Sequence, residues 1–437
     1  MWPSAVIFSY FHCISKGARH VQQETRKLAH LLGHAQRLYE QHCHLKNTDI
    51  LLTKSLSTLS AAGLSRTRRR LDSPCSRTTI VEGHEVINFA SNDYLGLANH
   101  PEIVGAIASG AQNWGAGSGA SHLVSGHLAP HEQLENRIAN FVGFERALTF
   151  STGYLANLAV TPTFAGKGDV VFTDKLNHAS LIDAMQLAKA NGATVRRYPH
   201  NNISQLSKLL ESSDAPTKLI VSDTVFSMDG DLAHLSELLT LAEQHDAWLM
   251  LDDAHGFGVL GPQGQGALAH FGLPSAHRVL LMGTLGKAAG VGGAFVAGSN
   301  VAIEYLLQKG RSYIFTTAAP PALACGLLKS LDLIEQGSAL RQHLFSRIEQ
   351  LQTGLSSGAT KLPWSLLPSM TAIQPLIIGS NEAALSLSKA LWERGIWVPA
   401  IRPPTVPEGT ARLRISVSAA HTESDVDLLI HALQELA

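Results

Sequence analysis

Two short polar stretches in this chain each follow a predicted buried strand directly. Asp252-Asp253-Ala254-His255-Gly256 comes after residues 248–251, and Gly283-Thr284-Leu285-Gly286-Lys287 comes after residues 279–282. A lysine amine can form a Schiff base with an aldehyde, and a carboxylate can keep a pyridine nitrogen protonated so that the ring accepts electrons. Seen alone, Lys287 is better explained as a surface lysine and Asp252 as a strand-end cap. Together they favour a site for pyridoxal phosphate (PLP).

Further polar residues stand where predicted strands give way to turns. The turn at Gly153 and Tyr154 opens a helix, whose backbone N–H groups and dipole could hold a phosphate. His178 could stack on a planar cofactor, and His255 and Ser227 could reach the phenolic oxygen of that cofactor. Taken alone, the strand-turn-helix with one glycine is common, a lone histidine is more often a cap or a core residue, and a serine in a turn needs no such role. The glycine-rich run 115–120 follows a predicted helix rather than a strand, so we discount a dinucleotide-binding loop.

Arg402 lies in a proline-rich segment, Ala400-Ile401-Arg402-Pro403-Pro404-Thr405. Arginine binds a carboxylate through two parallel hydrogen bonds, and rigid neighbours lower the entropy cost of holding it in place. A proline-rich surface loop explains the segment about as well. The sequence therefore offers Arg402 as a candidate carboxylate ligand.

The elements that must position these groups alternate between strand and helix patterns. The chain has 437 residues, more than one hydrophobic core usually organises, so more than one lobe is expected. Helix-length segments separate the apolar strand candidates, which are residues 147–150, 169–172, 218–222, 248–251, 279–282 and 293–296. This pattern predicts a mainly parallel sheet, and ligands of such sheets bind at the carboxyl ends of the strands.

We expect four segments along the chain. Residues 1–45 form an N-terminal extension of unclear status with a helix-like stretch at 24–39, and residues 46–96 contain an amphipathic helix over 51–70 and small strands with a hairpin near Gly83. Residues 97–318 form a large α/β domain, and residues 319–437 form a smaller α+β domain.

Composition excludes several other classes of function. The formal net charge is −1, without long runs of one sign, so neither nucleic-acid binding nor attachment to a membrane surface is indicated. The four cysteines are scattered, which argues against a disulfide framework and a zinc knuckle, and no metal is expected. No apolar run approaches the roughly 20 residues of a membrane span, and no secretory signal is found. These features predict a cytoplasmic protein acting on small molecules.

From about residue 46 to the end, the chain resembles the α-oxoamine synthases, which are PLP enzymes of the aspartate-aminotransferase fold. The resemblance rests on the lysine and aspartate motifs, on Ala120-Ser121-His122-Leu123-Val124-Ser125-Gly126-His127, and on the 400–421 passage with Arg412-Leu413-Arg414-Ile415. It implies fold type I, with a large mainly parallel sheet lobe and a smaller C-terminal α+β lobe. It also implies a homodimer with active sites at the interface.

The resemblance assigns roles residue by residue. Lys287 resembles the Schiff-base lysine, Asp252 the partner of the pyridine nitrogen and His178 the stacking histidine; with His255 they form the catalytic set. The cofactor-binding set implied is Lys287, Gly153, Tyr154, His178, Ser227, Asp252, His255, Thr284, Thr316 and Thr317, the last two reaching the phosphate of the neighbouring subunit. The substrate-binding set implied is Arg402, Arg68 and Asn92, although the basic cluster of residues 66–70 aligns ambiguously.

Within this family, the two motif passages are most similar to members that condense L-alanine with a pimeloyl thioester. The implied reaction is a decarboxylative acyl transfer giving 8-amino-7-oxononanoate in biotin biosynthesis, with the acyl group carried on coenzyme A or on acyl carrier protein. One alternative is a sister synthase that uses glycine with acetyl-CoA or succinyl-CoA. A more distant one is a catalytically silent subunit that keeps the fold for dimerisation, which the presence of both Lys287 and Asp252 disfavours.

Overall fold

The computed structural model describes residues 29–34, 47–356 and 362–437 in two units, 1–68 and 69–437. In the first unit, residues 29–34 and 47–61 are helical. The predicted helix over 51–70 is too long: it ends at 61 because Gly63 adopts a left-handed φ of 64° and the N–H of Leu64 bonds back to the carbonyl of Leu59 at 2.8 Å. Most of the predicted 24–39 helix lies outside the described residues.

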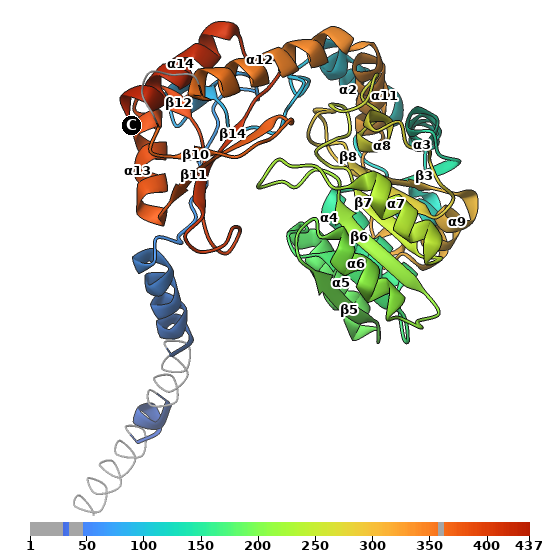
Figure 1. The fold of residues 1–437 in the computed structure, drawn as a ribbon. Coiled ribbons are helices and arrows are strands. Elements are labelled where there is room, and N and C mark those ends of the chain that lie inside the picture. The colour runs from blue at the N-terminus through green and yellow to red at the C-terminus, as the bar shows by residue number, and fades with distance from the viewer. Residues whose placement is uncertain (1–28, 35–46, 357–361) are drawn as a thin grey trace, which may run out of the picture. The chain divides into compact units, whose positions relative to one another are not determined.

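A seven-stranded sheet forms the centre of the second unit (Figure 1). Its strands run in the order β3-β9-β8-β7-β6-β4-β5. All pair in parallel except β9, which is antiparallel to both of its neighbours. The bounds are β3 Arg146–Phe150, β4 Val170–Asp174, β5 Thr194–Tyr198, β6 Lys218–Asp223, β7 Trp248–Asp252, β8 Val279–Thr284 and β9 Ala294–Gly298. The prediction of a mainly parallel sheet is confirmed.

Helices cover both faces of this sheet, so its strands are buried on each side. Along β7, Leu249 and Leu251 pack into one hydrophobic cluster, whereas Met250 points into the other. The helices of this lobe are α3 Ala129–Val142, α4 Gly153–Phe164, α5 Ala179–Ala190, α6 Ile203–Glu211, α7 Leu235–Gln244, α8 Ala267–His270, α9 Asn300–Lys309 and α10 Arg311–Ile314, with a π-helical turn η1 at His122–Gly126. The arrangement is a three-layer α/β/α sandwich.

Two smaller sheets accompany the C-terminal part of the chain. One has the order β10-β11-β14-β13, and the other, β1-β2-β12, pairs β2 with β12 in parallel. The strands are β1 Thr78–Val81, β2 His84–Asn88, β10 Ser365–Leu366, β11 Ile373–Gly379, β12 Ile396–Trp397, β13 Ala400–Ile401 and β14 Ala411–Ser416. The remaining helices are α2 Pro101–Trp114, α11 Pro321–Gln336, α12 Ser338–Ser356, α13 Asn381–Trp392 and α14 Glu423–Glu435.

The hairpin expected near Gly83 is present between β1 and β2. Val81 pairs with His84, and the two turn residues Glu82 and Gly83 have φ angles of 53° and 80°. Two consecutive positive φ values are typical of the type I′ turn that matches the twist of a hairpin. Since β2 also pairs with β12, this N-terminal hairpin and the C-terminal segment share one sheet. Among the described residues, no helix is both long and apolar enough to span a membrane.

Glu135 of α3 is a buried carboxyl group whose ionisation should oppose folding. Its Oε1 accepts hydrogen bonds from the backbone N and the Oγ1 of Thr149, both at 2.8 Å. Burial raises the pKa of Glu135 from 4.5 to about 7, so the folded chain binds this proton more tightly than the unfolded chain. The contribution of Glu135 to stability therefore falls as pH rises from about 4.5 to about 7.

We predict that Glu135→Gln stabilises the protein at pH 8 by about 1–3 kcal/mol and has little effect at pH 4.5. The glutamine oxygen can still accept both Thr149 hydrogen bonds, while the charged state is removed. Melting temperatures of wild type and variant, measured at equal protein concentration across this pH range, test the prediction. A variant less stable than wild type at pH 8 would contradict it.

Candidate active site

Strand ends from five parts of the sequence meet at one edge of the central sheet. β4, β6, β7 and β8 are mutually parallel, and β3 runs in the same direction because β9 is antiparallel to both β3 and β8. Their carboxyl ends lead into Gly153, His178, Ser227, the Asp252–His255 stretch and Lys287. Parallel strands thus place these residues along a single edge, as the sequence predicted.

Lys287 lies in the turn after β8, and its amine contacts a histidine. The Nζ atom is 2.8 Å from Nε2 of His255. Burial lowers the pKa of Lys287 from 10.5 to about 8; the negative charge of Asp252 opposes this shift, and the positive charge of Arg414 adds to it. An appreciable fraction of the amine is therefore neutral near pH 7 to 8, the form that attacks an aldehyde or accepts a proton.

His255 is held from behind by a tyrosine that the sequence analysis did not single out. The Nδ1 of His255 is 2.7 Å from the hydroxyl of Tyr94, and this hydroxyl donates to Oδ1 of Asn92 at 3.0 Å. Because the tyrosine hydrogen goes to Asn92, we assign the hydrogen of the His255–Tyr94 bond to Nδ1. Nε2 then accepts from Lys287. Burial lowers the pKa of His255 well below 6.5, which keeps the ring neutral.

Arg414 of β14 links this group to the C-terminal part of the chain. It donates to Oδ1 of Asn92 at 3.0 Å, to the hydroxyl of Tyr94 at 3.4 Å, and from Nε to the carbonyl of Ser227 at 2.7 Å. Ser227 therefore takes part through its backbone. The guanidinium brings a fixed positive charge close to Lys287, which helps to explain the lowered pKa of that amine.

Asp252 is almost fully buried at the end of β7, with 3 % of its surface exposed. Its Oδ2 accepts from Nδ2 of Asn157 at 2.8 Å, and its Oδ1 accepts from the backbone N of Ala254 at 3.0 Å. The neighbouring strand places Asp223 opposite Asp252. Burial and the charge of Asp252 raise the pKa of Asp223 well above 3.8.

His178 is oriented by the start of α5. Its Nδ1 is 2.7 Å from Oγ of Ser180, and its backbone N donates to Oδ2 of Asp223 at 2.7 Å. Ser180 also accepts from Nδ2 of Asn157 at 2.8 Å, the amide that holds Asp252. His178 is exposed as a residue, while Nδ1 of its ring is fixed by Ser180. A flat ring held in this way can stack on a planar cofactor.

The N-terminus of α4 and the end of β8 form a small cradle. A Cβ on Gly153 would lie 3.6 Å from Cε of Met282 and 3.9 Å from Oγ1 of Thr284, so the helix start adjoins Thr284. Backbone N–H groups at the start of this 12-residue helix, where Thr152 caps that of Leu155, suit a phosphate together with the hydroxyl of Thr284. With the amine and the buried carboxylate, these groups match the aldehyde, pyridine nitrogen and phosphate of PLP.

The remaining predicted residues lie in different surroundings. The hydroxyl of Tyr154 donates to Asp183 of α5. Thr316 and Thr317 follow α10, and Thr317 pairs with Ser121. Arg402 follows β13 next to a cis peptide bond between the two prolines. Arg68 belongs to the first unit, whose position relative to the active site is not described.

Four residues that contact the predicted site received no role from the sequence, and they differ in the signal they carry. Asp223 stands at a strand end like Asp252, so the same reasoning could have found it. Arg414 lies in a passage used for the family resemblance and Tyr94 does not, and only the fold shows that they meet, 320 positions apart. Asn157 lies inside α4, and nothing in its helical context marks it as a partner of Asp252.

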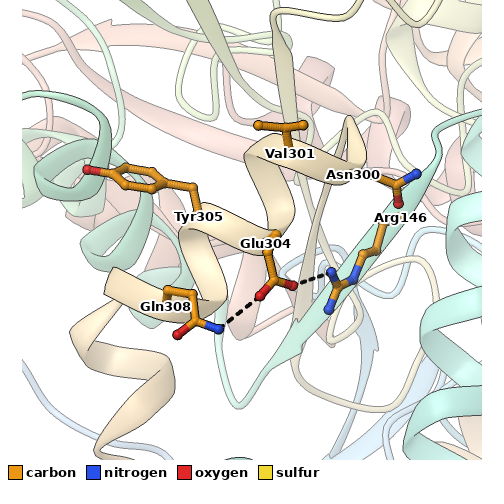
Figure 2. A pocket seen from close by; sticks show the side chains of 6 residues that line it. All are labelled: Arg146, Asn300, Val301, Glu304, Tyr305 and Gln308. Carbon is orange, nitrogen blue, oxygen red and sulfur yellow. Dashed lines mark hydrogen bonds and ion pairs between the residues drawn. The ribbon is translucent and has the colours of Figure 1, made fainter.

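The surface also carries a hollow of about 620 Å³ that shares no residue with this site (Figure 2). Its polar groups satisfy one another: Glu304 pairs with Arg146 at 2.6 Å and accepts from Nε2 of Gln308 at 2.8 Å. The remaining lining residues are Asn300, Val301 and Tyr305. No group there is poised for the chemistry predicted for Lys287.

We predict that cofactor-free protein takes up PLP faster as pH rises, with an apparent pKa near 8 for the lysine. The neutral amine is the reactive form, and burial has shifted its titration downward from 10.5. Removal of the nearby positive charge in Arg414→Gln should move the profile to higher pH. Stopped-flow absorbance over pH 6 to 10 checks both statements, and a profile still rising at pH 10 in wild type would contradict them.

Comparisons with known proteins agree with this geometry. The sequence profile for "Aminotransferase class I and II" matches residues 84–433. An 8-amino-7-oxononanoate synthase from Dechloromonas aromatica is 69% identical over 386 residues, covering 88% of this chain and 99% of the relative. That from Herminiimonas arsenicoxydans is 58% identical, covering 88% of this chain and 98% of the relative.

Two solved structures are also similar to the fold. A serine palmitoyltransferase from S. paucimobilis with bound PLP aligns with a TM-score of 0.82 at 29% identity, covering 90% of this chain and 97% of that one. An 8-amino-7-oxononanoate synthase from Francisella tularensis aligns with a TM-score of 0.69 at 30% identity, covering 80% and 97%. The chain therefore belongs to the aminotransferase class I and II family and, within it, to the 8-amino-7-oxononanoate synthases.

Proposed function

We propose that this protein is a PLP-dependent acyltransferase that condenses L-alanine with a pimeloyl thioester. The products are 8-amino-7-oxononanoate, carbon dioxide and the free thiol of the acyl carrier, and the reaction belongs to biotin biosynthesis. The observation that carries the proposal is the 69% identity to a synthase of this name over 99% of that protein's length. The paired Lys287 and Asp252 at neighbouring strand ends supply the chemistry that the name requires.

Bound PLP supplies an electron sink for the charge that develops on the alanine Cα. Lys287 would anchor the cofactor, and its amine would then stand beside the alanine carbon that must lose a proton. Its pKa of about 8 lets the amine accept that proton and return one after carbon dioxide leaves. His255 fixes the position of the amine through the 2.8 Å contact, and Tyr94 fixes His255. Holding base and carbon together makes the transfer effectively intramolecular.

Asp252 is the residue that we assign to the pyridine nitrogen. The side-chain amide of Asn157 and the backbone N–H of Ala254 hold its carboxylate in place. A buried carboxylate raises the pKa of a contacting pyridine nitrogen, which keeps that nitrogen protonated. We assign His178 to stacking on the ring, Gly153, Tyr154 and Thr284 to the phosphate, and His255 and Ser227 to the phenolic side.

The substrate, subunit and domain assignments extend the proposal. Arg402 offers a fork for the alanine carboxylate, and Arg68 and Asn92 are assigned to the acyl substrate. A homodimer would place Thr316 and Thr317 at the cofactor phosphate of the neighbouring subunit. The acyl carrier is coenzyme A or acyl carrier protein, and a cytoplasmic location fits the free thiols of Cys75 and Cys325. The divisions 46–96, 97–318 and 319–437 stay proposed domain boundaries.

Neither alternative function is favoured. The relatives at 54–69% identity share one name, which does not support a glycine-using sister synthase. A silent dimerisation subunit would have no reason to keep a buried amine contacting His255 and a buried carboxylate beside it. The active-site geometry therefore supports catalysis.

Mass spectrometry of the reaction products tests the proposal. Purified, PLP-loaded protein is given L-alanine with pimeloyl-CoA or pimeloyl-acyl carrier protein, and 8-amino-7-oxononanoate and carbon dioxide are quantified. Glycine with acetyl-CoA or succinyl-CoA is the matched comparison. Product from alanine alone supports the proposal. Product from glycine alone would establish the sister activity. If no substrate pair gave product, the catalytically silent subunit would be the favoured alternative.

A further inference from the structure

Three histidines gather outside the active site, around the π-helical turn η1. In this turn the backbone N of Gly126 donates to the carbonyl of Ser121 at 2.9 Å, five residues back. A five-residue repeat brings positions five apart onto one side, and His122 and His127 are separated by that interval. Their Nδ1 atoms are 2.9 Å apart. The backbone conformation thus brings two imidazole rings together.

His131, in the first turn of α3, is the third member. Ligand-capable nitrogens of His122, His127 and His131 all lie within 4.8 Å of one another. Nδ1 of His131 accepts from the backbone N of Leu128 at 3.0 Å, and Nε2 lies 2.8 Å from the carbonyl of Ala319. These bonds direct the ring toward the other two. His131 can offer a ring nitrogen to a bound ion only if it gives up one of these two backbone hydrogen bonds.

Neighbouring groups hold the rings of this cluster in place. The His122 ring stacks on Tyr313, with centroids 5.1 Å apart and an interplanar angle of 8°. Burial lowers the pKa of His122 to about 4, and the pKa values of His127 and His131 are lowered by burial as well.

We propose that His122, His127 and His131 bind one divalent transition-metal ion of the Zn²⁺ type. Three imidazoles without a carboxylate in the cluster favour such an ion over Mg²⁺ or Ca²⁺, which prefer oxygen ligands. Two nitrogens bound tetrahedrally to Zn²⁺ lie about 3.3 Å apart, given bonds of about 2.0 Å. The His122–His127 pair therefore needs only a small separation, and the hydrogen of the Nδ1–Nδ1 bond passes to Nε2 of its own ring, which leaves both Nδ1 atoms free to bind the ion.

The segment that carries the histidine cluster is already joined to a distant part of the chain by backbone hydrogen bonds. The N–H of Ala318 donates to the carbonyl of Ala120 at 3.0 Å, and Ser121 pairs with Thr317. Metal binding would therefore cross-link η1 and α3 within a segment that is already held to residues 317–318 by backbone hydrogen bonds. The sequence analysis expected no metal, because its search for paired cysteines and their spacing does not detect a π-helical His pair.

Metal titration of the full-length, PLP-loaded protein tests this proposal. Co²⁺ is followed by its visible absorption, and Zn²⁺ by calorimetry, with one ion per chain expected. His122→Phe keeps a ring against Tyr313 but removes the ligand, and His127→Gln removes the second ligand. Each should weaken binding at least about tenfold. His270→Phe, at an exposed histidine in α8, is the control and should bind as wild type.

The readout is metal affinity, so the outcome does not depend on the proposed reaction. Circular dichroism establishes that each variant is folded before titration. Loss of the single tight site in both His122→Phe and His127→Gln, but not in His270→Phe, supports the assignment. Unchanged affinity in folded His122→Phe, or absence of a one-to-one site in wild type, would overturn it.

Discussion

Replacement of Lys287 by alanine is expected to lower the rate of product formation by at least about 10⁴-fold. The substitution removes both the covalent anchor of PLP and the amine that accepts and returns the Cα proton. His255 cannot take over, because burial keeps its pKa well below 6.5 and its Nδ1 is bonded to Tyr94. Product quantification by mass spectrometry gives the rate. Borohydride reduction followed by peptide mapping shows whether any lysine still carries PLP.

Lys175→Ala is the matched control for that experiment. Lys175 is exposed and hydrogen-bonds through its backbone: its N donates to the carbonyl of Tyr198 at 3.1 Å, and its carbonyl accepts from Arg197 at 3.0 Å. The variant should keep wild-type rate and a reducible PLP attachment at Lys287. A Lys287→Ala enzyme that retains a rate near wild type would show that another group performs the chemistry, and the assignment of Lys287 would be wrong.

Asp252→Asn is expected to keep PLP bound but to slow removal of the alanine Cα proton by about 10²–10⁴-fold. Asparagine is nearly the same size and cannot hold the pyridine nitrogen protonated, whereas the amine and the phosphate cradle remain. The negative charge of Asp252 raises the pKa of Lys287, so its removal leaves the amine more readily neutral. A slower exchange therefore cannot come from a protonated base. Exchange of the alanine Cα hydrogen in D₂O, followed by NMR, measures this step without the thioester.

Asp253→Asn, the same substitution at the next residue, is the control that separates an effect on catalysis from an effect on folding. Asp253 is buried and points elsewhere: Thr224 donates to its Oδ1 at 2.5 Å, and the backbone N of Ala267 donates to its Oδ2 at 3.0 Å. Asp253→Asn should cost about 1–3 kcal/mol of stability through these bonds while folded protein keeps the exchange rate. If Asp252→Asn exchanged the alanine hydrogen at the wild-type rate, its partnership with the pyridine nitrogen would be ruled out.

The hydrogen-bonding partners of Lys287 and His255 come from distant parts of the sequence. Lys287, His255 and Tyr94 form a continuous chain of contacts of 2.7–2.8 Å, and Arg414 donates to the far end of it. Burial of the amine, in the presence of this fixed cation, explains why the pKa of Lys287 falls to about 8. Such a shift is a property of the packed interior, so no local pattern predicts it.

Several parts of the fold follow from local patterns, and others do not. The strands that carry Asp252 and Lys287 are short apolar runs followed by polar residues, and each appears at the predicted place. The edge strand β5, Thr194–Tyr198, was missed because two arginines interrupt its apolar pattern. The 51–70 helix was drawn too long because helical periodicity continued past Gly63, where a left-handed φ ends the helix.

The sequence by itself determined the fold class, the cofactor chemistry and the residues at the strand ends, because these depend on periodicity and on residue types that act close to their own element. The tertiary structure decided which groups meet there. Four residues contact the site through hydrogen bonds or strand pairing that depend on how distant segments pack, namely Tyr94, Asn157, Asp223 and Arg414. The His122–His127 pair arises from a π-helical turn. Long-range contacts and the burial that shifts pKa values exist only after packing, which is why no local stretch of sequence reveals them.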